Sequence, residues 1–288
     1  MNSRTQHNDP TGTGSLGLAY HYEMLADKER VAPFRHAIER TCAGRRVLES
    51  GTGSAIFSIL AAKAGAAHVY AVEVDPVVAR FAQENIRKSG YEKLITLINK
   101  DALDITLADL DGERAQVVIA ENLSTWQVTE PQILLMNYIN VHLLTPHAVH
   151  IPEGVSNYLE LAHTNYRFED VVDLRTHYFI FTGLQEPLIL SERVLFEKVD
   201  FSQQCATTFQ KKVMIEATSD GIGNSLRLTS PVQVYQDISF GSSDSLMPPV
   251  VVPLEEDITV KKGDSVEITV EYTVHTKWES FRCKAKVV

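Results

Sequence analysis

The hydrophobic positions in the first half of the chain alternate between helical spacing and short apolar runs. Helical spacing predicts helices over 21–43, 54–64 and 76–88, and another after Glu130-Pro131 to about Leu143. Apolar runs between these segments predict strands at 47–50, 69–73, 94–98 and 116–120. Gly65 and Gly90 follow two of the helices, at positions where glycine commonly ends a helix. Helices that alternate with strands in this way predict a parallel, doubly wound α/β sheet.

The pattern changes at Ile151-Pro152-Glu153-Gly154, after which short runs alternate between apolar and polar residues. These runs cover 158–162, 177–182, 194–199, 212–217, 225–228, 232–238, 265–274 and 281–287. Turn signals such as Lys262-Gly263-Asp264 separate them, so they predict antiparallel β structure, a barrel or a sandwich. We therefore expect a flexible segment over 1–20, a Rossmann-like domain over 21–151 and a β-barrel-like substrate domain over 152–288.

The net charge of the chain indicates which kinds of partner it can bind. Lys+Arg 27 against Asp+Glu 37 gives a formal net charge of −10. A basic surface is usual in proteins that bind nucleic acid, so this balance argues against a nucleic-acid partner. It is compatible with a cationic substrate, and also with the simpler role of keeping a protein in solution.

Nothing in the sequence indicates export or insertion into a membrane. No apolar run approaches the roughly 20 residues that a spanning helix needs, and the polar start of the chain is unlike a signal peptide. Cys42, Cys205 and Cys283 lie far apart without metal-ligand spacing, so we expect buried thiols in a reducing compartment and no metal site. The expected location is the cytoplasm, with no membrane partner.

The segment Val47-Leu48-Glu49-Ser50-Gly51-Thr52-Gly53, followed by Glu73 at the end of the next apolar run, predicts a site for an adenosyl group. Glycines let the backbone approach a ligand closely, and a carboxylate roughly 20 residues later can accept the ribose hydroxyls. A dinucleotide fingerprint requires a third glycine, where this chain has Ile56. The acidic Glu49 has no use beside a pyrophosphate but suits a cofactor with an ammonium and a sulfonium. These residues favour S-adenosylmethionine over a dinucleotide.

Four segments resemble the protein arginine methyltransferase family over nearly the full length of the chain. They are His21-Tyr22-Glu23-Met24-Leu25-Ala26-Asp27-Lys28-Glu29-Arg30, the stretch from Val47 through the glycine turn to Glu73, Glu121-Asn122-Leu123-Ser124-Thr125-Trp126-Gln127-Val128-Thr129-Glu130, and Ile258-Thr259-Val260-Lys261-Lys262-Gly263-Asp264. The resemblance implies a Rossmann-like domain followed by a β-barrel, with S-adenosyl-L-methionine as cofactor and S-adenosyl-L-homocysteine as product.

The resemblance also implies the residues of the cofactor site. Arg30 would pair with the cofactor carboxylate, a geometry that a guanidinium suits, and His21 would help at the same end. The implied cofactor-binding set is His21, Met24, Arg30, Glu49, Gly51, Gly53, Glu73, Val74, Asp101 and Ala102. Of these, Glu73 would hold the ribose, and Asp101 would meet the adenine edge. Arg30 could instead be a solvated helix residue, and Asp101 merely a turn residue.

The third segment keeps the nine-residue spacing of the family's "double-E" loop, which implies that Glu121 and Glu130 are the catalytic residues. A guanidinium is a poor nucleophile because its pKa is high and its lone pairs are delocalised. Two carboxylates can bind it through charge-assisted hydrogen bonds, aim one nitrogen at the methyl group and stabilise the charge during transfer. Glu130 could alternatively be an acidic residue that interacts with the dipole of the following helix.

Three departures from the family pattern bear on the acceptor. Thr11-Gly12-Thr13-Gly14-Ser15 stands where the family has an aromatic segment, and Ser245-Leu246-Met247 stands where it has a Thr-His-Trp loop. The chain between Tyr166 and Leu188 is too short for the family's helical dimerisation arm. We therefore expect a shortened relative with a diverged acceptor pocket and without the arm-mediated ring dimer, while other oligomers stay open.

The leading hypothesis is an S-adenosylmethionine-dependent N-methyltransferase that acts on a guanidino group. The acceptor would be arginine in a peptide or protein, free arginine or a small guanidine. The alternative enzyme keeps the cofactor site but methylates a nitrogen, oxygen or carbon atom of another small molecule. A scaffold that binds only the cofactor or a partner is the non-enzymatic alternative, against which the retained spacing of Glu121 and Glu130 argues.

Overall fold

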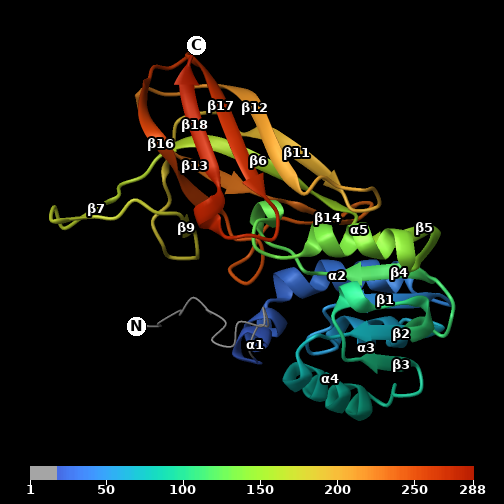
Figure 1. Ribbon diagram of the computed structural model, residues 1–288. Coiled ribbons are helices and arrows are strands. Elements are labelled where there is room, and N and C mark those ends of the chain that lie inside the picture. The colour runs from blue at the N-terminus through green and yellow to red at the C-terminus, as the bar shows by residue number, and fades with distance from the viewer. Residues whose placement is uncertain (1–17) are drawn as a thin grey trace. The chain divides into compact units, whose positions relative to one another are not determined.

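A computed structural model describes residues 18–288 of the chain (Figure 1). These residues form two compact units. The first, here called the Rossmann unit, contains the described residues up to Asn122 together with Leu135–Glu153 and Val234–Phe240. The second, the barrel unit, contains Leu123–Leu134, Gly154–Gln233 and Gly241–Val288. Most of the segment expected to be flexible, and the 11–15 stretch that replaces the family's aromatic segment, lie outside the described residues.

The Rossmann unit is built on a parallel sheet of five strands. They are β1 (Arg46–Ser50), β2 (His68–Val72), β3 (Ile95–Ile98), β4 (Ala115–Ala120) and β5 (Leu144–Ile151), in the order β3-β2-β1-β4-β5. Every neighbouring pair is parallel. The strand order reverses between β1 and β4, and ligands of doubly wound sheets bind beyond the carboxyl ends of the strands at such a point. The predicted doubly wound parallel sheet is confirmed.

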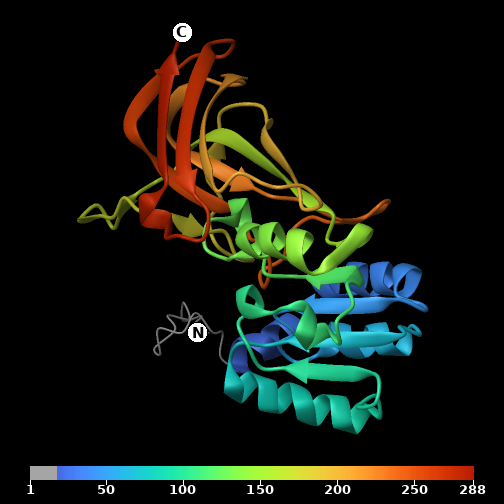
Figure 2. The ribbon, with the colours of Figure 1, turned by 45° about the vertical axis from the view of Figure 1, so that its right-hand side comes forward.

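Five α-helices accompany the strands in the described part of the chain. They are α1 (Leu18–Ala26), α2 (Lys28–Thr41), α3 (Ile56–Lys63), α4 (Pro76–Ser89) and α5 (Gln132–His142). Two short 3-10 turns, η1 (Ala102–Asp104) and η2 (Leu107–Leu110), lie between β3 and β4. Figure 2 shows α4 beside β3. Asp75 caps α4 by accepting hydrogen bonds from Val77 N and Val78 N, and Gly90 ends the helix with φ +77°.

The prediction of one helix over 21–43 is wrong, because the chain forms two helices that meet at Asp27. Asp27 has extended backbone angles, and its carboxylate accepts a hydrogen bond from Arg30 N at 3.1 Å. Such a cap satisfies a backbone donor that the first turn of a helix leaves unpaired, so it favours a new helix start. This break places Arg30 in the first turn of α2.

The barrel unit is built of antiparallel strands, as predicted. Its main strands are β6 (Gly154–His163), β11 (Val194–Asp200), β12 (Thr208–Glu216), β13 (Gly221–Thr229), β16 (Val250–Val260), β17 (Ser265–Thr273) and β18 (Arg282–Val287). It also contains the first two residues of β14 (Val232–Tyr235). One sheet runs β14-β6-β13-β16, with β9 (Tyr178–Phe179) beside β16 and with β10 (Leu188–Ile189) and β11 on β6. A second sheet runs β12-β17-β18.

Several strand predictions needed correction. The strand predicted over 177–182 is reduced to β9, and the run over 232–238 splits at Gln236 into β14 and β15 (Ile238–Phe240). Gln236 has φ +48°, which an extended strand cannot accommodate. The sequence reading also did not predict β5 or β16 as strands, although β16 is the longest strand described.

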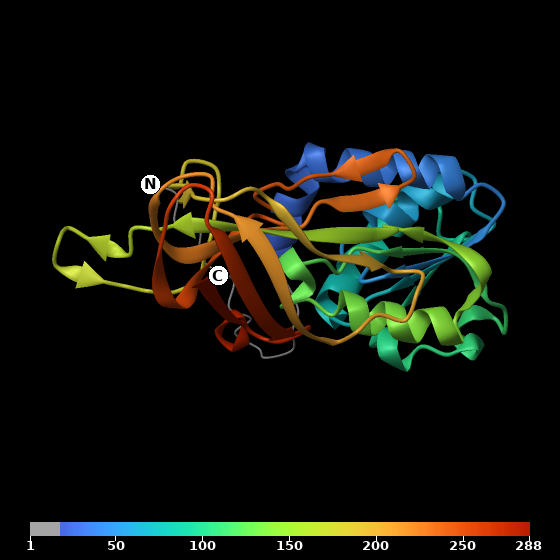
Figure 3. The same ribbon diagram turned by 90° about the horizontal axis from the view of Figure 1, so that it is seen from above.

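The chain between Tyr166 and Leu188 contains no helix, and all of these residues are described. It forms a hairpin of β7 (Arg167–Phe168) and β8 (Val172–Asp173), which projects from the barrel unit (Figure 3). No described helix is long and apolar enough to cross a membrane.

The barrel core holds the loop that follows β4. Trp126, in the 3-10 turn η3 (Thr125–Gln127), is completely buried. The centre of its ring lies 4.6 Å from the ring centre of Phe196 and 5.6 Å from that of Tyr272. Its indole nitrogen donates to the Tyr158 carbonyl at 3.2 Å. Aromatic contacts of this kind add to the free energy gained by burying the ring.

Replacing Trp126 with alanine should lower the free energy of unfolding by about 3–5 kcal/mol, because it leaves a cavity among aromatic rings. Urea denaturation followed by circular dichroism measures the effect. The matched control is Phe168→Ala, since Phe168 is 53% exposed on the β7–β8 hairpin and its loss should change stability by less than about 0.5 kcal/mol. Equal effects of the two substitutions would contradict the anchoring role of Trp126.

Candidate active site

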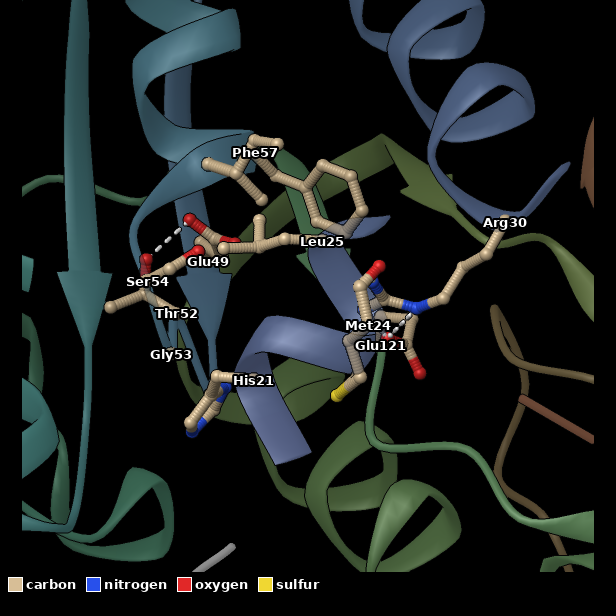
Figure 4. Close-up of a pocket in the computed structure, with 12 residues that line it drawn as sticks. His21, Met24, Leu25, Arg30, Glu49, Thr52, Gly53, Ser54, Phe57 and Glu121 are labelled. Atoms are coloured by element: carbon tan, nitrogen blue, oxygen red, sulfur yellow. Dashed lines mark hydrogen bonds and ion pairs between the residues drawn. The ribbon is translucent and has the colours of Figure 1, made fainter. Parts of the chain in front are cut away.

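A pocket in the Rossmann unit lies where the first and fourth strands end (Figure 4). Its lining combines one arginine, two glutamates, small residues of the glycine turn and apolar side chains. The lining residues are His21, Met24, Leu25, Arg30, Glu49, Gly51, Thr52, Gly53, Ser54, Ile56, Phe57 and Glu121. The pocket therefore gathers residues from α1, α2, β1, the glycine turn, α3 and the end of β4.

The turn after β1 requires glycine at two positions. Gly51 has φ +70°, and a Cβ atom there would lie 2.5 Å from the Asn122 side-chain oxygen. Gly53 has φ +54°, and a Cβ there would lie 2.8 Å from the His21 ring. Both residues thus combine a left-handed backbone with a close neighbour, which only glycine tolerates without displacement. These close neighbours are side chains of the protein itself, and the close approach of a ligand to this turn stays a prediction.

Glu73 supports the same turn from the end of β2. One carboxylate oxygen accepts a hydrogen bond from Gly53 N at 2.9 Å, and the other accepts one from Asp75 N at 3.0 Å. Burial raises the pKa of the Glu73 carboxyl, against these two hydrogen bonds, which lower it. A carboxylate has about four lone-pair positions, so each oxygen can still accept a further donor.

Glu49 is buried at the end of β1 and points toward the base of the turn. Its Oε2 accepts a hydrogen bond from the Thr52 hydroxyl at 2.7 Å and another from the Ser58 hydroxyl. Burial raises the pKa of the Glu49 carboxyl to about 7, and the two hydroxyl donors only partly offset this. A cation placed beside Glu49 would favour its charged form.

Arg30 and Glu121 form a buried ion pair. Arg30 Nε donates to Glu121 Oε2 at 3.0 Å, and Arg30 Nη2 bonds the same oxygen. Only 6% of the arginine side chain and 5% of the glutamate side chain are exposed. Arg30 Nη1 donates to the Met24 carbonyl at 3.1 Å, and the guanidinium lies 5.5 Å from the centre of the Phe57 ring. Arg30 is thus not a solvated helix residue.

Glu130 belongs to the barrel unit, in the segment Leu123–Leu134. The Ser124 hydroxyl accepts hydrogen bonds from Thr129 N and Glu130 N, both at 3.1 Å, and so closes the loop. Buried Trp126 and Gln127 anchor the middle of this loop. The two glutamates of the nine-residue motif are therefore held by different units.

Four predicted cofactor residues do not line this pocket: Glu73, Val74, Asp101 and Ala102. The Asp101 side chain caps η1 through Leu103 N at 2.9 Å, and Val74 is 50% exposed. The sequence reading also missed several lining residues, namely Leu25, Thr52, Ser54, Ile56 and Phe57. Thr52 and Ser54 could have been included because they lie in the glycine turn itself.

The residues at the expected place of the Thr-His-Trp loop contribute to the barrel core. Leu246 and Met247 are 3% and 1% exposed. The Thr125 hydroxyl donates to the Pro248 carbonyl at 2.7 Å, so this segment contacts the loop that precedes Glu130 within the barrel unit.

The residues present fit an adenosyl cofactor that carries an amino acid. Arg30 can pair with a carboxylate, and Glu49 and Glu121 can face cationic groups. No group of three or more His, Cys, Asp or Glu residues among the described residues could hold a metal ion.

Sequence comparisons also match this chain to methyltransferases. The sequence model of a family described as Ribosomal protein L11 methyltransferase (PrmA) matches residues 36–135. An uncharacterized protein of Methanocaldococcus jannaschii is 32% identical over 88% of this chain and 91% of its own length. The Arginine N(omega)-methyltransferase of Streptomyces achromogenes subsp. streptozoticus is 25% identical over 89% of this chain and 77% of its own length. The chain belongs to the arginine methyltransferase-like family of S-adenosylmethionine-dependent methyltransferases.

Solved structures show the same fold for this methyltransferase. The Trypanosoma brucei PRMT1 enzyme–prozyme complex with AdoHcy superposes with a TM-score of 0.76 at 17% identity, over 94% of this chain and 98% of that chain. This likeness covers both the Rossmann-like domain and the β-barrel. The predicted enzyme class and the predicted cofactor, S-adenosylmethionine, are confirmed.

Changing Gly51 to alanine should weaken binding of S-adenosylhomocysteine at least about tenfold, or 1.4 kcal/mol, because the new methyl group displaces Asn122 at the turn. Gly44→Ala is a closely matched control, since Gly44 also has φ +70° but has no atom within 4 Å of the added Cβ. Both variants should lose about 1–2 kcal/mol of stability from the left-handed backbone, whereas only the first should lose affinity. Calorimetric titration of both variants decides the matter, and equal affinities would contradict the role of the turn.

The Glu49 carboxyl should make the cofactor-free methyltransferase less stable as pH rises from 4.5 to about 7. Its pKa is higher in the folded chain, so the folded state binds the proton more tightly, and stability falls across this window. Glu49→Gln removes the titration, so its stability relative to wild type should rise by about 3 kcal/mol between pH 4.5 and pH 8.

Denaturation at several pH values measures this difference. Glu84→Gln serves as the control, because hydrogen bonding to Arg87 lowers the pKa of the Glu84 carboxyl to about 2, below the window. Parallel stability profiles for wild type and Glu49→Gln would show that Glu49 does not titrate in this range.

Proposed function

We propose that this methyltransferase transfers the methyl group of S-adenosylmethionine to a guanidino nitrogen of arginine or of a related small guanidine. The observation that carries the proposal is the buried Glu121 carboxylate, held at the end of β4 by Arg30, with Glu130 nine residues later in the sequence. The Streptomyces relative named Arginine N(omega)-methyltransferase matches most of this chain and supports the same acceptor group.

In this proposal Glu121 and Glu130 bind the guanidinium through charge-assisted hydrogen bonds. A guanidinium presents five N–H donors, which carboxylates match well. The two negative charges stabilise the positive charge of the group throughout the transfer, and the hydrogen bonds orient the reacting nitrogen. Because Arg30 already fixes one oxygen of Glu121, that carboxylate is preorganised before the acceptor binds.

The residues around the pocket would hold the cofactor, which supplies an electrophilic methyl group. Arg30 would bind its carboxylate, with His21 and Met24 beside it, and Glu49 would face its ammonium. Glu73 would accept the ribose hydroxyls with the lone pairs that Gly53 N and Asp75 N leave open. We assign the adenine side to Val74, Asp101 and Ala102, beyond the ends of β2 and β3.

The cellular setting is part of the proposal. We infer a cytoplasmic enzyme, because its three cysteines are free. Cys42 and Cys283 are buried as expected, whereas Cys205 is only half-buried. The net charge of −10 suits a cationic acceptor rather than nucleic acid or an acidic membrane surface. The short 166–188 segment favours a protein without the arm-mediated ring dimer.

The test is methyl transfer from labelled S-adenosylmethionine to a panel of acceptors. The panel contains free arginine, small guanidines, an arginine-containing peptide, lysine and simple amines. Label on a guanidino nitrogen supports the proposal and identifies the acceptor. Label found only on amines, or on no acceptor of the panel, would refute it.

Glu121→Gln and Glu130→Gln should each lower kcat about a hundredfold or more, because each removes one preorganised charge from the transition state. Cofactor affinity of the Glu130→Gln variant should stay within a few-fold of wild type, since its loss falls on turnover. Glu256→Gln, an exposed position in β16, is the control and should be fully active. Wild-type rates in both active-site variants would rule out the guanidinium clamp.

A further inference from the structure

The turn between β17 and β18 contacts the main chain of the loop that carries Glu130. His275 N donates to the Gln127 carbonyl at 3.3 Å, and Thr276 N donates to the Val128 carbonyl at 2.7 Å. The His275 side chain adds a third bond, from Nδ1 to the Thr129 carbonyl at 3.2 Å. All of these residues belong to the barrel unit. Three successive carbonyl groups of the loop are thus bound by one turn.

The peptide group that joins Thr129 to Glu130 is held on both sides. Its carbonyl oxygen accepts the hydrogen bond from His275 Nδ1, and its N–H donates to the Ser124 hydroxyl at 3.1 Å. A peptide group is planar, so fixing its oxygen and its hydrogen fixes the plane. The Cα atom of Glu130 lies in that plane. The direction in which the Glu130 side chain leaves the backbone is therefore set in part by His275.

The backbone on both sides of this contact adopts an uncommon conformation. His275 has φ +53°, and its partner Gln127 has φ +55°, next to Trp126 with φ +57°. Residues with side chains rarely adopt positive φ, and glycine or asparagine does so more readily. Outliers of this kind persist where the surrounding structure determines them, and they cluster at functional sites.

We propose that His275 is a positioning residue, which orients Glu130 through the Thr129 carbonyl for methyl transfer. This inference rests on the proposed function of Glu130. Because a carbonyl oxygen can only accept a hydrogen bond, Nδ1 of the imidazole carries the proton in this contact. In the sequence, His275 lies in the β17–β18 turn, about 30 residues after the 245–247 segment that stands where the arginine methyltransferase family has its histidine.

Two substitutions at this position separate the side-chain donor from the backbone. His275→Gly suits the positive φ but removes the donor, whereas His275→Asn also tolerates positive φ and keeps an amide donor close to the position of Nδ1. We expect kcat of the glycine variant to fall roughly tenfold, with cofactor affinity and the KM of the acceptor little changed. The asparagine variant should recover most of the activity.

A double-mutant cycle tests whether His275 acts through Glu130. If it does, His275→Gly should lower kcat less than about twofold when Glu130 is already glutamine, because the positioned charge is then absent. An equal loss in both backgrounds would overturn the proposal, as would equal activity of the glycine and asparagine variants.

Amide hydrogen exchange gives a readout that needs no acceptor. In the full-length protein, the Glu130 amide should exchange faster in His275→Gly than in wild type or His275→Asn. Unchanged exchange would overturn the positioning role even if activity fell. Wild-type protein that methylates no guanidine would instead overturn the proposed function, while exchange at Glu130 would still decide whether His275 holds this peptide group.

Discussion

The buried ion pair between Arg30 and Glu121 is the interaction on which the candidate site depends. It joins the first turn of α2 to the residue that follows β4, and each charge compensates the other where solvent is almost excluded. A buried charge that loses its partner destabilises a protein by about 3–5 kcal/mol. The pair therefore joins α2 to the end of β4 and fixes the position of the Glu121 carboxylate in the pocket lining.

The other carboxylates of the pocket region are also held by hydrogen bonds within the protein. Glu73 accepts the N–H groups of Gly53 and Asp75, and Glu49 accepts the hydroxyls of Thr52 and Ser58. Two buried carboxylates thus accept hydrogen bonds from the glycine turn, Glu73 from Gly53 N and Glu49 from the Thr52 hydroxyl. Acidic residues that a ligand would use are already oriented by the protein.

Sequence patterns predicted the parallel sheet, the glycine turn and most barrel strands, because these depend on local periodicity and on glycine chemistry. They failed where a single residue overrides the pattern, as Asp27 does between α1 and α2 and Gln236 does between β14 and β15. The strand β16 escaped prediction because Pro253 and the acidic residues after it interrupt its apolar run.

For the candidate site, sequence motifs identified several residues but not the contacts between them. Motif positions identified Arg30, Glu49 and Glu121, which the structure brings to one pocket. No motif could show that Arg30 bonds Glu121, or that Phe57 lies beside the guanidinium, since these contacts join elements distant in the sequence. The contact between His275 and the Thr129 carbonyl spans an even longer stretch of chain.

The anchoring of Trp126 has a consequence for chimeric enzymes. Sequence order suggests that a barrel could be exchanged by joining two relatives at residue 152. Such a junction would leave Trp126 from one parent facing the Phe196 and Tyr272 positions of the other. To keep this packing intact, a chimera must take Leu123–Leu134 and the barrel strands from the same parent. Glu130 then comes from the same parent as the barrel that holds it.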